Sequence, residues 1–161
     1  MMETSNETVS LKIPAKSEFV GVARLTVSGI ANRMGFNYDD IEDIKIAVSE
    51  ACTNVVNHAY KNVDEGQIEI NLNCSETSLT ITVIDQGNCF EVDKVLNELK
   101  PIDVTMSLNQ INEGGLGLFL INTLMDEVNI SSGSGIIVKM SKLLNRDEVD
   151  MNANRVSTTT E

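Results

Sequence analysis

Apolar positions at the start of the chain change from a period of two to a period of about 3.6. Val9, Leu11 and Ile13 alternate with polar residues, which predicts a short strand ended by Pro14. From Ser17 to about Arg33 an apolar residue recurs every three or four positions, which predicts a helix. Gly35 is its expected stop.

A second helix is predicted to begin near Asp40. Asp39 followed by Glu42, just before the next apolar period, has the spacing of a capping box, in which each side chain satisfies a free backbone donor. This helix is expected to run to about Ala59.

The rest of the chain predicts an antiparallel hairpin, a second α/β segment and two closing strands. The strands are predicted at Ile68–Leu72, Leu79–Val83, Glu127–Ser131 and Ile136–Leu143. The first two form a hairpin with one buried face. A short helix is expected from Glu91 to Leu99 before Pro101, and the connection 102–113 is expected to be a lid. From Leu118 to Met125 apolar residues occupy nearly every side of a further helix, which is therefore expected to be largely buried.

Length and composition favour a single folded domain. The chain has 161 residues, of which 42% are hydrophobic. We expect a flexible segment at 1–7, a domain at 8–144 and a disordered polar tail at 145–161.

Charge and cysteine content restrict the classes of partner and compartment. With 24 acidic and 12 basic residues, the net charge of −12 disfavours nucleic acid and is compatible with a basic protein partner. The three cysteines form no CxxC pair, which favours free thiols over a disulfide framework or zinc site. Neither a signal peptide nor a run of about 18 apolar residues is found, so no membrane contact and a cytoplasmic location are expected.

A polar stripe runs along the second predicted helix. Glu50, Asn54 and His58 are four residues apart, so their side chains share a narrow arc of the helix. An amide oxygen such as that of Asn54 suits Mg²⁺, which takes few protein ligands, and Glu50 one turn earlier is placed to accept a proton. A single histidine at a helix end is more often a supporting residue than a catalyst, so no direct role is assigned to His58.

Each of two further motifs is weak evidence for a function when it is taken alone. Asp85-x-Gly87 ends a predicted strand, where such a motif is common in turns. A buried carboxylate there would also accept a hydrogen bond from an exocyclic amine, and so select adenine over guanine. Gly114-Gly115-Leu116-Gly117 opens a helix, where exposed amides and the positive helix end suit an anion, although the same glycines fit a cap or close packing. No Lys-Ser or Lys-Thr follows, so this is not a Walker loop.

Taken together, the order and spacing of these motifs resemble the GHKL ATPase superfamily. The motifs are Glu50-x-x-x-Asn54-x-x-x-His58-Ala59, Asp85-x-Gly87 and Gly114 to Leu118. Within that superfamily, Val48–Asn54 and Gly114–Val128 resemble the RsbW-type anti-sigma-B serine kinases. The resemblance extends from about Val9 to Leu144.

The resemblance implies an α/β (α+β) two-layer sandwich of Bergerat type, with a mixed, mostly antiparallel sheet covered by helices on one face. It implies ATP and Mg²⁺, with Glu50 as catalytic base and Asn54 as metal ligand. The implied nucleotide-binding residues are Asn54, Asp85, Gly87, Gly114, Gly115, Leu116, Gly117 and Leu118.

The resemblance also implies a function and partners. Such a protein sequesters a sigma-B type sigma factor, phosphorylates a serine of an anti-anti-sigma factor and works as a homodimer. Two alternatives remain at this point: a nucleotide-stabilised anti-sigma module without kinase activity, which would not need Glu50, and a sensor histidine kinase fragment, for which no helical dimerisation segment is expected before Val9.

Two departures from the family pattern bear on the nucleotide site. Ile137 is aligned where relatives commonly carry a threonine, which removes a water-mediated contact. Asn112-Glu113 replaces an arginine that some relatives carry before the glycines, and 102–138 contains no Lys or Arg. Charge neutralisation in the transition state is therefore expected to rest on Mg²⁺, backbone amides or a residue from elsewhere.

Overall fold

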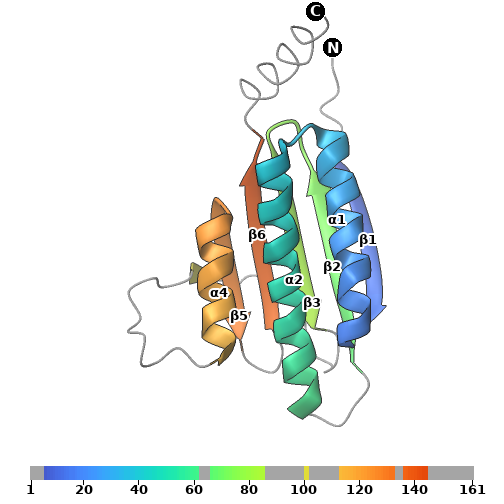
Figure 1. The fold of residues 1–161 in the computed structure, drawn as a ribbon, viewed down its shortest axis with the longest axis vertical. Helices are drawn as coiled ribbons and strands as arrows, with labels where there is room; N and C mark the ends of the chain where they lie inside the picture. The colour runs from blue at the N-terminus through green and yellow to red at the C-terminus, as the bar shows by residue number, and fades with distance from the viewer. Residues whose placement is uncertain (1–5, 62–65, 86–99, 102–112, 133–135, 145–161) are drawn as a thin grey trace, which may run out of the picture.

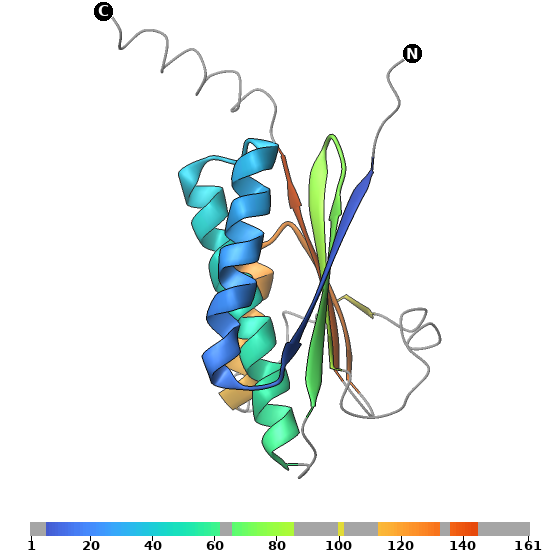
Figure 2. The ribbon, with the colours of Figure 1, turned by 90° about the vertical axis from the view of Figure 1, so that its right-hand side faces the viewer.

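The structure, a computed structural model, has two layers: a sheet, and helices that cover one of its faces. It describes residues 6–61, 66–85, 100–101, 113–132 and 136–144. Figure 1 looks onto the helices, and Figure 2 shows the helix layer and the sheet edge-on. The predicted two-layer α+β class, with helices on one face, is confirmed.

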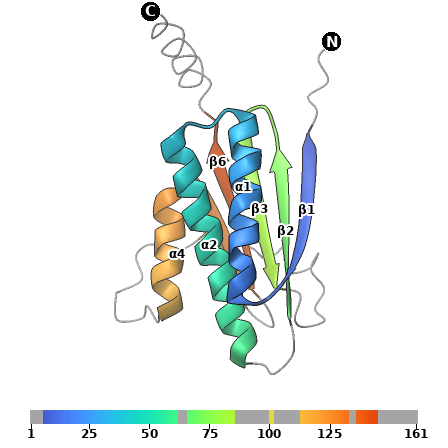
Figure 3. The same ribbon diagram turned by 45° about the vertical axis from the view of Figure 1, so that its right-hand side comes forward.

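The described elements follow the predicted order closely. The helices are η1 (Ser17–Phe19), α1 (Val20–Met34), α2 (Tyr38–Lys61) and α4 (Glu113–Leu124). The strands are β1 (Glu7–Pro14), β2 (Gln67–Cys74), β3 (Ser78–Asp85), β4 (Lys100–Pro101), β5 (Glu127–Ser132) and β6 (Ile136–Leu143). Figure 3 shows α1, α2 and α4 beside one another over the sheet.

The sheet has the strand order β1-β2-β3-β6-β5-β4. Each pairing in the described residues is antiparallel, including the predicted hairpin of β2 and β3, which agrees with the mostly antiparallel sheet that the family resemblance implied. β6, the last of the described strands, therefore lies between β3 and β5 in the middle of the sheet.

The boundaries of the first two helices come from particular side chains. Gly35 ends α1 in the left-handed conformation, with φ 97°, as predicted. The predicted cap of α2 at Asp39 is wrong: Asn37 Oδ1 accepts the Asp40 N–H at 2.8 Å, so the helix begins at Tyr38. Asp39 lies in the first turn instead, where the positive end of the helix dipole stabilises a negative charge.

The core lies between the helices and the inner face of the sheet. Ile68, Ile70 and Leu72 of β2 alternate with polar residues and are fully buried, as the pattern predicts. The prediction of one buried face is wrong for the end of β3, because Thr82 and Ile84 on its outer face are 7% and 3% exposed. Ile84 lies outside the main core cluster.

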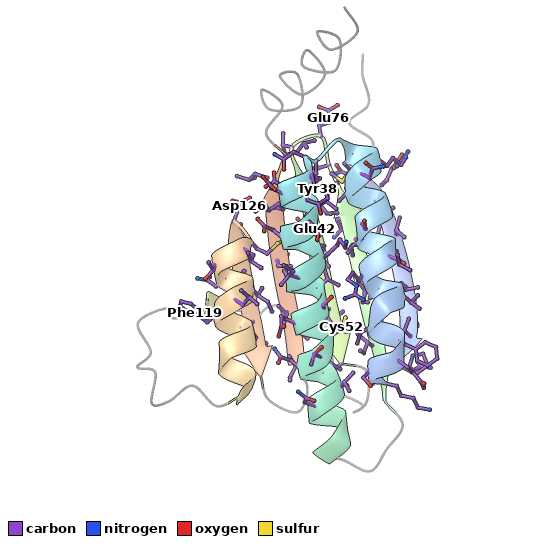
Figure 4. The ribbon with its side chains drawn as sticks, in the orientation of Figure 1. Tyr38, Glu42, Cys52, Glu76, Phe119 and Asp126 are labelled. Atoms are coloured by element: carbon purple, nitrogen blue, oxygen red, sulfur yellow. The ribbon has the colours of Figure 1, made fainter. Side chains whose placement is uncertain are left out.

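The prediction of a largely buried helix after the glycines is also corrected. In α4, Ile121 is fully buried, but Phe119 is 50% and Leu120 36% exposed. Figure 4 shows Phe119 on the side of α4 away from α2. Among the described helices, α4 lies at the edge of the layer, and no other described element covers that side, so an all-round apolar pattern overestimates its burial.

Several predicted segments lie outside the described residues: the helix at 91–99, the lid at 102–113 apart from its last residue, and the tail at 145–161. Glu113, which was predicted to lie in the lid, is the first residue of α4. Within the described ranges, none of the helices has the length and apolar character needed to span a membrane. β1 begins at Glu7, one residue before the predicted domain boundary.

Candidate functional site

The predicted chemical pair lies on one side of α2. Glu50 and Asn54 are one helical turn apart and each is partly exposed, between the buried Val48, Ala51 and Val55. Both polar side chains are thus held on a helix whose opposite side is fixed in the core. His58 belongs to the same helix, but its side chain lies outside the described residues.

α4 approaches this pair at Gly117. A methyl group added at Gly117 would lie 2.8 Å from Oε2 of Glu50, and 3.5 and 3.6 Å from Oδ1 and Nδ2 of Asn54. The structure therefore brings together three of the predicted site residues, although Gly117 lies 67 positions after Glu50 and 63 after Asn54. Only a residue without a side chain allows the two helices to approach this closely while the Glu50 carboxylate keeps its place.

The glycines belong to the helix itself. α4 begins at Glu113, so Gly114 and Gly115 lie in its first turn, where backbone N–H groups have no partner within the helix. Gly117 is the fifth residue of the helix, beyond those first four donors. The geometry therefore favours Gly114 and Gly115 as anion-binding amides, and gives Gly117 a steric reason to be glycine.

Asp85 ends β3 and is 2% exposed. It follows Val83 on the face of the sheet that the helices cover, because neighbouring side chains alternate between faces. β3 runs from the hairpin that contains Glu76 toward the end of the molecule where the Cys52 half of α2 lies (Figure 4). The buried carboxylate thus shares an end of the fold with Glu50 and Asn54. Gly87 lies outside the described residues.

Ile137 does not face this site. It pairs with Ile84, whereas the neighbouring pair of Val83 and Val138 belongs to the helix-covered core. Ile137, which is fully buried, therefore points to the opposite face of the sheet from Asp85. The alignment that placed Ile137 beside the nucleotide is corrected by the strand register.

Among the described residues, neither a reactive thiol nor a cluster of metal-binding side chains accompanies Glu50 and Asn54. Burial raises the pKa of the Cys52 thiol to about 12, so it stays protonated at neutral pH. No group of three or more His, Cys, Asp and Glu side chains in this part of the chain could hold a metal by itself. The amide oxygen of Asn54, close to Gly117, is of the ligand type that Mg²⁺ takes together with phosphate oxygens and water.

Comparison with known proteins gives a consistent family. Residues 13–142 match the family model described as a histidine kinase-like ATPase domain. The serine-protein kinase RsbW of Halalkalibacterium halodurans is 54% identical over 153 residues, which cover 95% of this chain and 93% of that protein. The Bacillus subtilis protein of the same name is 47% identical and covers 92% of this chain and 93% of its own length.

A solved structure shares the fold. The crystal structure of the RsbU and RsbW domains of a Mycobacterium tuberculosis protein matches with a TM-score of 0.60 and 20% identity. The match covers 85% of this chain and 32% of that longer chain. At this identity the likeness supports the fold alone.

Proposed function

The chain belongs to the RsbW family of serine-protein kinases, within the histidine kinase-like ATPases, and we propose that Glu50, Asn54, Asp85 and the glycines of α4 form its kinase site. The observation that carries the assignment of these residues is the contact of Gly117 with Glu50 and Asn54. It joins the predicted base and metal ligand of α2 to the predicted phosphate-binding helix.

The proposed reaction is in-line phosphoryl transfer from ATP to a serine hydroxyl. The serine oxygen attacks the γ-phosphorus, the bond from γ-phosphorus to the bridging oxygen breaks, and ADP leaves with that oxygen. Glu50 accepts the hydroxyl proton. Its place on a helix packed into the core keeps the carboxylate oriented without a loop having to close on it.

The other residues bind and orient the nucleotide. Asp85 accepts a hydrogen bond from the adenine amine, and the free amides at Gly114 and Gly115 donate to phosphate oxygens. Asn54 would hold Mg²⁺ through its amide oxygen; the ion supplies neutralisation of phosphate charge. Since 102–138 contains no Lys or Arg, neutralisation of that charge is proposed to come from the ion, from backbone amides or from a residue elsewhere in the chain.

The proposed phosphorylation substrate is a serine of an anti-anti-sigma factor, and the same chain is proposed to sequester a sigma-B type sigma factor in the cytoplasm. The support is the similarity to RsbW kinases over nearly the whole chain, together with an acidic balance that suits a basic partner surface. The kinase function is favoured over a binding-only module, because a module without catalysis has no need for Glu50 beside Gly117.

A labelled transfer assay tests this function. Purified chain, γ-labelled ATP and the cognate anti-anti-sigma protein should give label on one serine of that protein. Omission of Mg²⁺, or replacement of that serine by alanine, should remove the label. Binding of the sigma factor without any transfer would instead support the binding-only module.

Asp85→Asn should lower ATP affinity by about 10- to 100-fold, because a hydrogen bond to a charged acceptor is lost. It should also narrow the preference for ATP over GTP, since an amide N–H can donate to the guanine carbonyl that a carboxylate repels. Competition between the two nucleotides, measured by calorimetry, checks both effects. Asp126→Asn, an exposed carboxylate at the far end of α4, is the matched control. Unchanged ATP affinity in the Asp85 variant would contradict the adenine-binding role.

We further propose that the chain works as a homodimer through the sheet face that none of the described helices covers (Figure 2). Among the described residues, the charged side chains on this face are those of Lys12, Glu69, Lys139 and Glu127. Their charges sum to zero, whereas the net charge of the whole chain is −12. Two copies can therefore approach there without the repulsion of the rest of the surface.

The dimer is tested by one substitution on that face. Thr80 pairs with Ser141 on the face, where their hydroxyls are 3.0 Å apart. Thr80→Arg should give a monomer by light scattering coupled to gel filtration, because two added cations would meet across the interface. Asn32→Arg, on the exposed surface of α1, should leave the mass unchanged. An unchanged dimer in the Thr80 variant would place the interface elsewhere.

A further inference from the structure

A single lysine joins the C-terminal end of α4 to the first turns of α2. Lys142 Nζ donates a hydrogen bond to the carbonyl oxygen of Leu124, the last residue of α4, at 2.6 Å. The same ammonium lies 3.5 Å from Oδ2 of Asp43 and 3.8 Å from Oδ1 of Asp40. Figure 4 shows that Asp126, two residues after α4, lies at the same end of the molecule as Tyr38 and Glu42 of α2.

This contact differs from an ordinary surface ion pair because it is sheltered. The Lys142 side chain is 11% exposed, and those of Asp40 and Asp43 are 24% and 34% exposed. Removing the lysine takes a sheltered cation away from the Asp43 carboxylate and the Leu124 carbonyl, which costs more than the loss of a surface pair. The cation also lies at a helix C-terminus and the carboxylates near a helix N-terminus, which are the favourable ends for those charges.

The sequence pattern gave no sign of this residue. Lys142 follows Val138 and Met140 at every second position of β6, so it points to the helix-covered face, where an apolar side chain is expected. A lysine there is tolerated because the last carbonyl of α4 and the two aspartates accept its charge. Nothing in the proposed transfer reaction uses it directly.

The contact lies on the helix that carries the site. α4 runs antiparallel to α2: Gly117 meets Glu50 and Asn54, and Leu124 is joined to Asp40 and Asp43 through Lys142. Seven residues of a helix span about 10.5 Å, so Gly117 and Leu124 are two turns apart on one rigid element. A shift at the Leu124 end therefore moves the Gly117 end as well.

We propose that Lys142 is a positioning residue, which holds α4 in register with α2 and so keeps Gly117 seated against the Glu50 carboxylate. The proposal rests on the proposed function of Glu50, and adds to it a contact at the other end of the helix. Lys142 acts through α4 and does not touch the reacting atoms.

A double-mutant cycle on phosphoryl transfer tests this role. Lys142→Met should lower kcat at saturating ATP about tenfold, because a displacement of the order of 1 Å at the catalytic base is costly. Combined with Gly117→Ala, which disturbs the same helix contact, the loss should be less than the product of the two single losses. Lys45→Met removes an ion pair to Glu42 within α2 and should leave kcat unchanged. Losses that multiply would overturn the proposal, because they indicate a merely structural effect.

A second variant and a second measurement keep the proposal testable in every case. If Lys142→Met does not fold, Asp43→Asn replaces it in the same cycle with the same criterion. If the unmodified chain transfers no phosphate, the proposed function fails, and hydrogen exchange then decides the inference. Exchange of the amides from Gly117 to Ile121 should quicken about tenfold in the variant, whereas a change confined to amides near Leu124 would overturn it.

Discussion

Replacement of Glu50 by glutamine should remove phosphoryl transfer by a factor of about 10² to 10⁴, while ATP binding stays within about threefold. Glutamine has nearly the same shape and still fits beside Gly117, but it cannot accept the serine proton. Because Asp85, Asn54 and the amides of α4 are unchanged, the nucleotide keeps its contacts. The variant therefore separates proton acceptance from binding.

Two measurements check this result on one preparation: single-turnover transfer of labelled phosphate to the partner protein, and calorimetric titration with ATP and Mg²⁺. Glu42→Gln is the matched control, since it makes the same chemical change two turns earlier on α2, where the side chain pairs with Lys45 at 2.9 Å. It should transfer phosphate at the unmodified rate. Full transfer by the Glu50 variant would rule out Glu50 as the base.

The sequence was most informative where spacing along one element decides the geometry. Glu50 and Asn54 share a side of α2 because they are four residues apart, and Gly35 ends α1 because a left-handed residue was needed there. The two-layer fold follows from the same periodicities. These features depend on neighbours within a few residues, which a single sequence displays.

Features that depend on contacts between elements were predicted less well. The contact of Gly117 with Glu50, and the direction in which Ile137 points, depend on helix packing and strand register. Phe119 was expected to be buried, but it is half exposed, because an apolar pattern does not reveal that α4 lies at the edge of the described helix layer. Lys142 gave no signal, since its three partners come from two helices distant in sequence. The α2 cap was misplaced because both Asn37 and Asp39 suit that role.

Gly117→Ala should lower kcat by about 10- to 100-fold with little loss of stability. The added methyl group would lie 2.8 Å from Oε2 of Glu50, which is closer than a Cβ carbon approaches an atom to which it is not bonded. Oε2 is the far end of a flexible side chain, so the carboxylate can move aside with little strain on the backbone. The atom that must move is also the proposed proton acceptor. The substitution should therefore lower kcat while leaving the free energy of unfolding almost unchanged.

Helix propensity makes the two effects easier to separate. Alanine favours a helix interior over glycine by about 1 kcal/mol, which offsets the strain of moving Glu50. Urea unfolding should accordingly give a free energy of unfolding close to that of the unmodified chain, or slightly above it. Single-turnover kinetics on the same samples measure the loss of transfer, and ATP titration tests whether binding is retained.

Gly29→Ala provides the control, because it makes the same substitution within α1 at a position where an added methyl group meets nothing within 4 Å. It should raise the free energy of unfolding and leave kcat unchanged. Strong destabilisation by Gly117→Ala would mean that the backbone of α2 moves, and not the Glu50 carboxylate. Full activity with unchanged stability would mean that the carboxylate keeps a productive position after moving, and that the close approach of α4 is not needed for transfer.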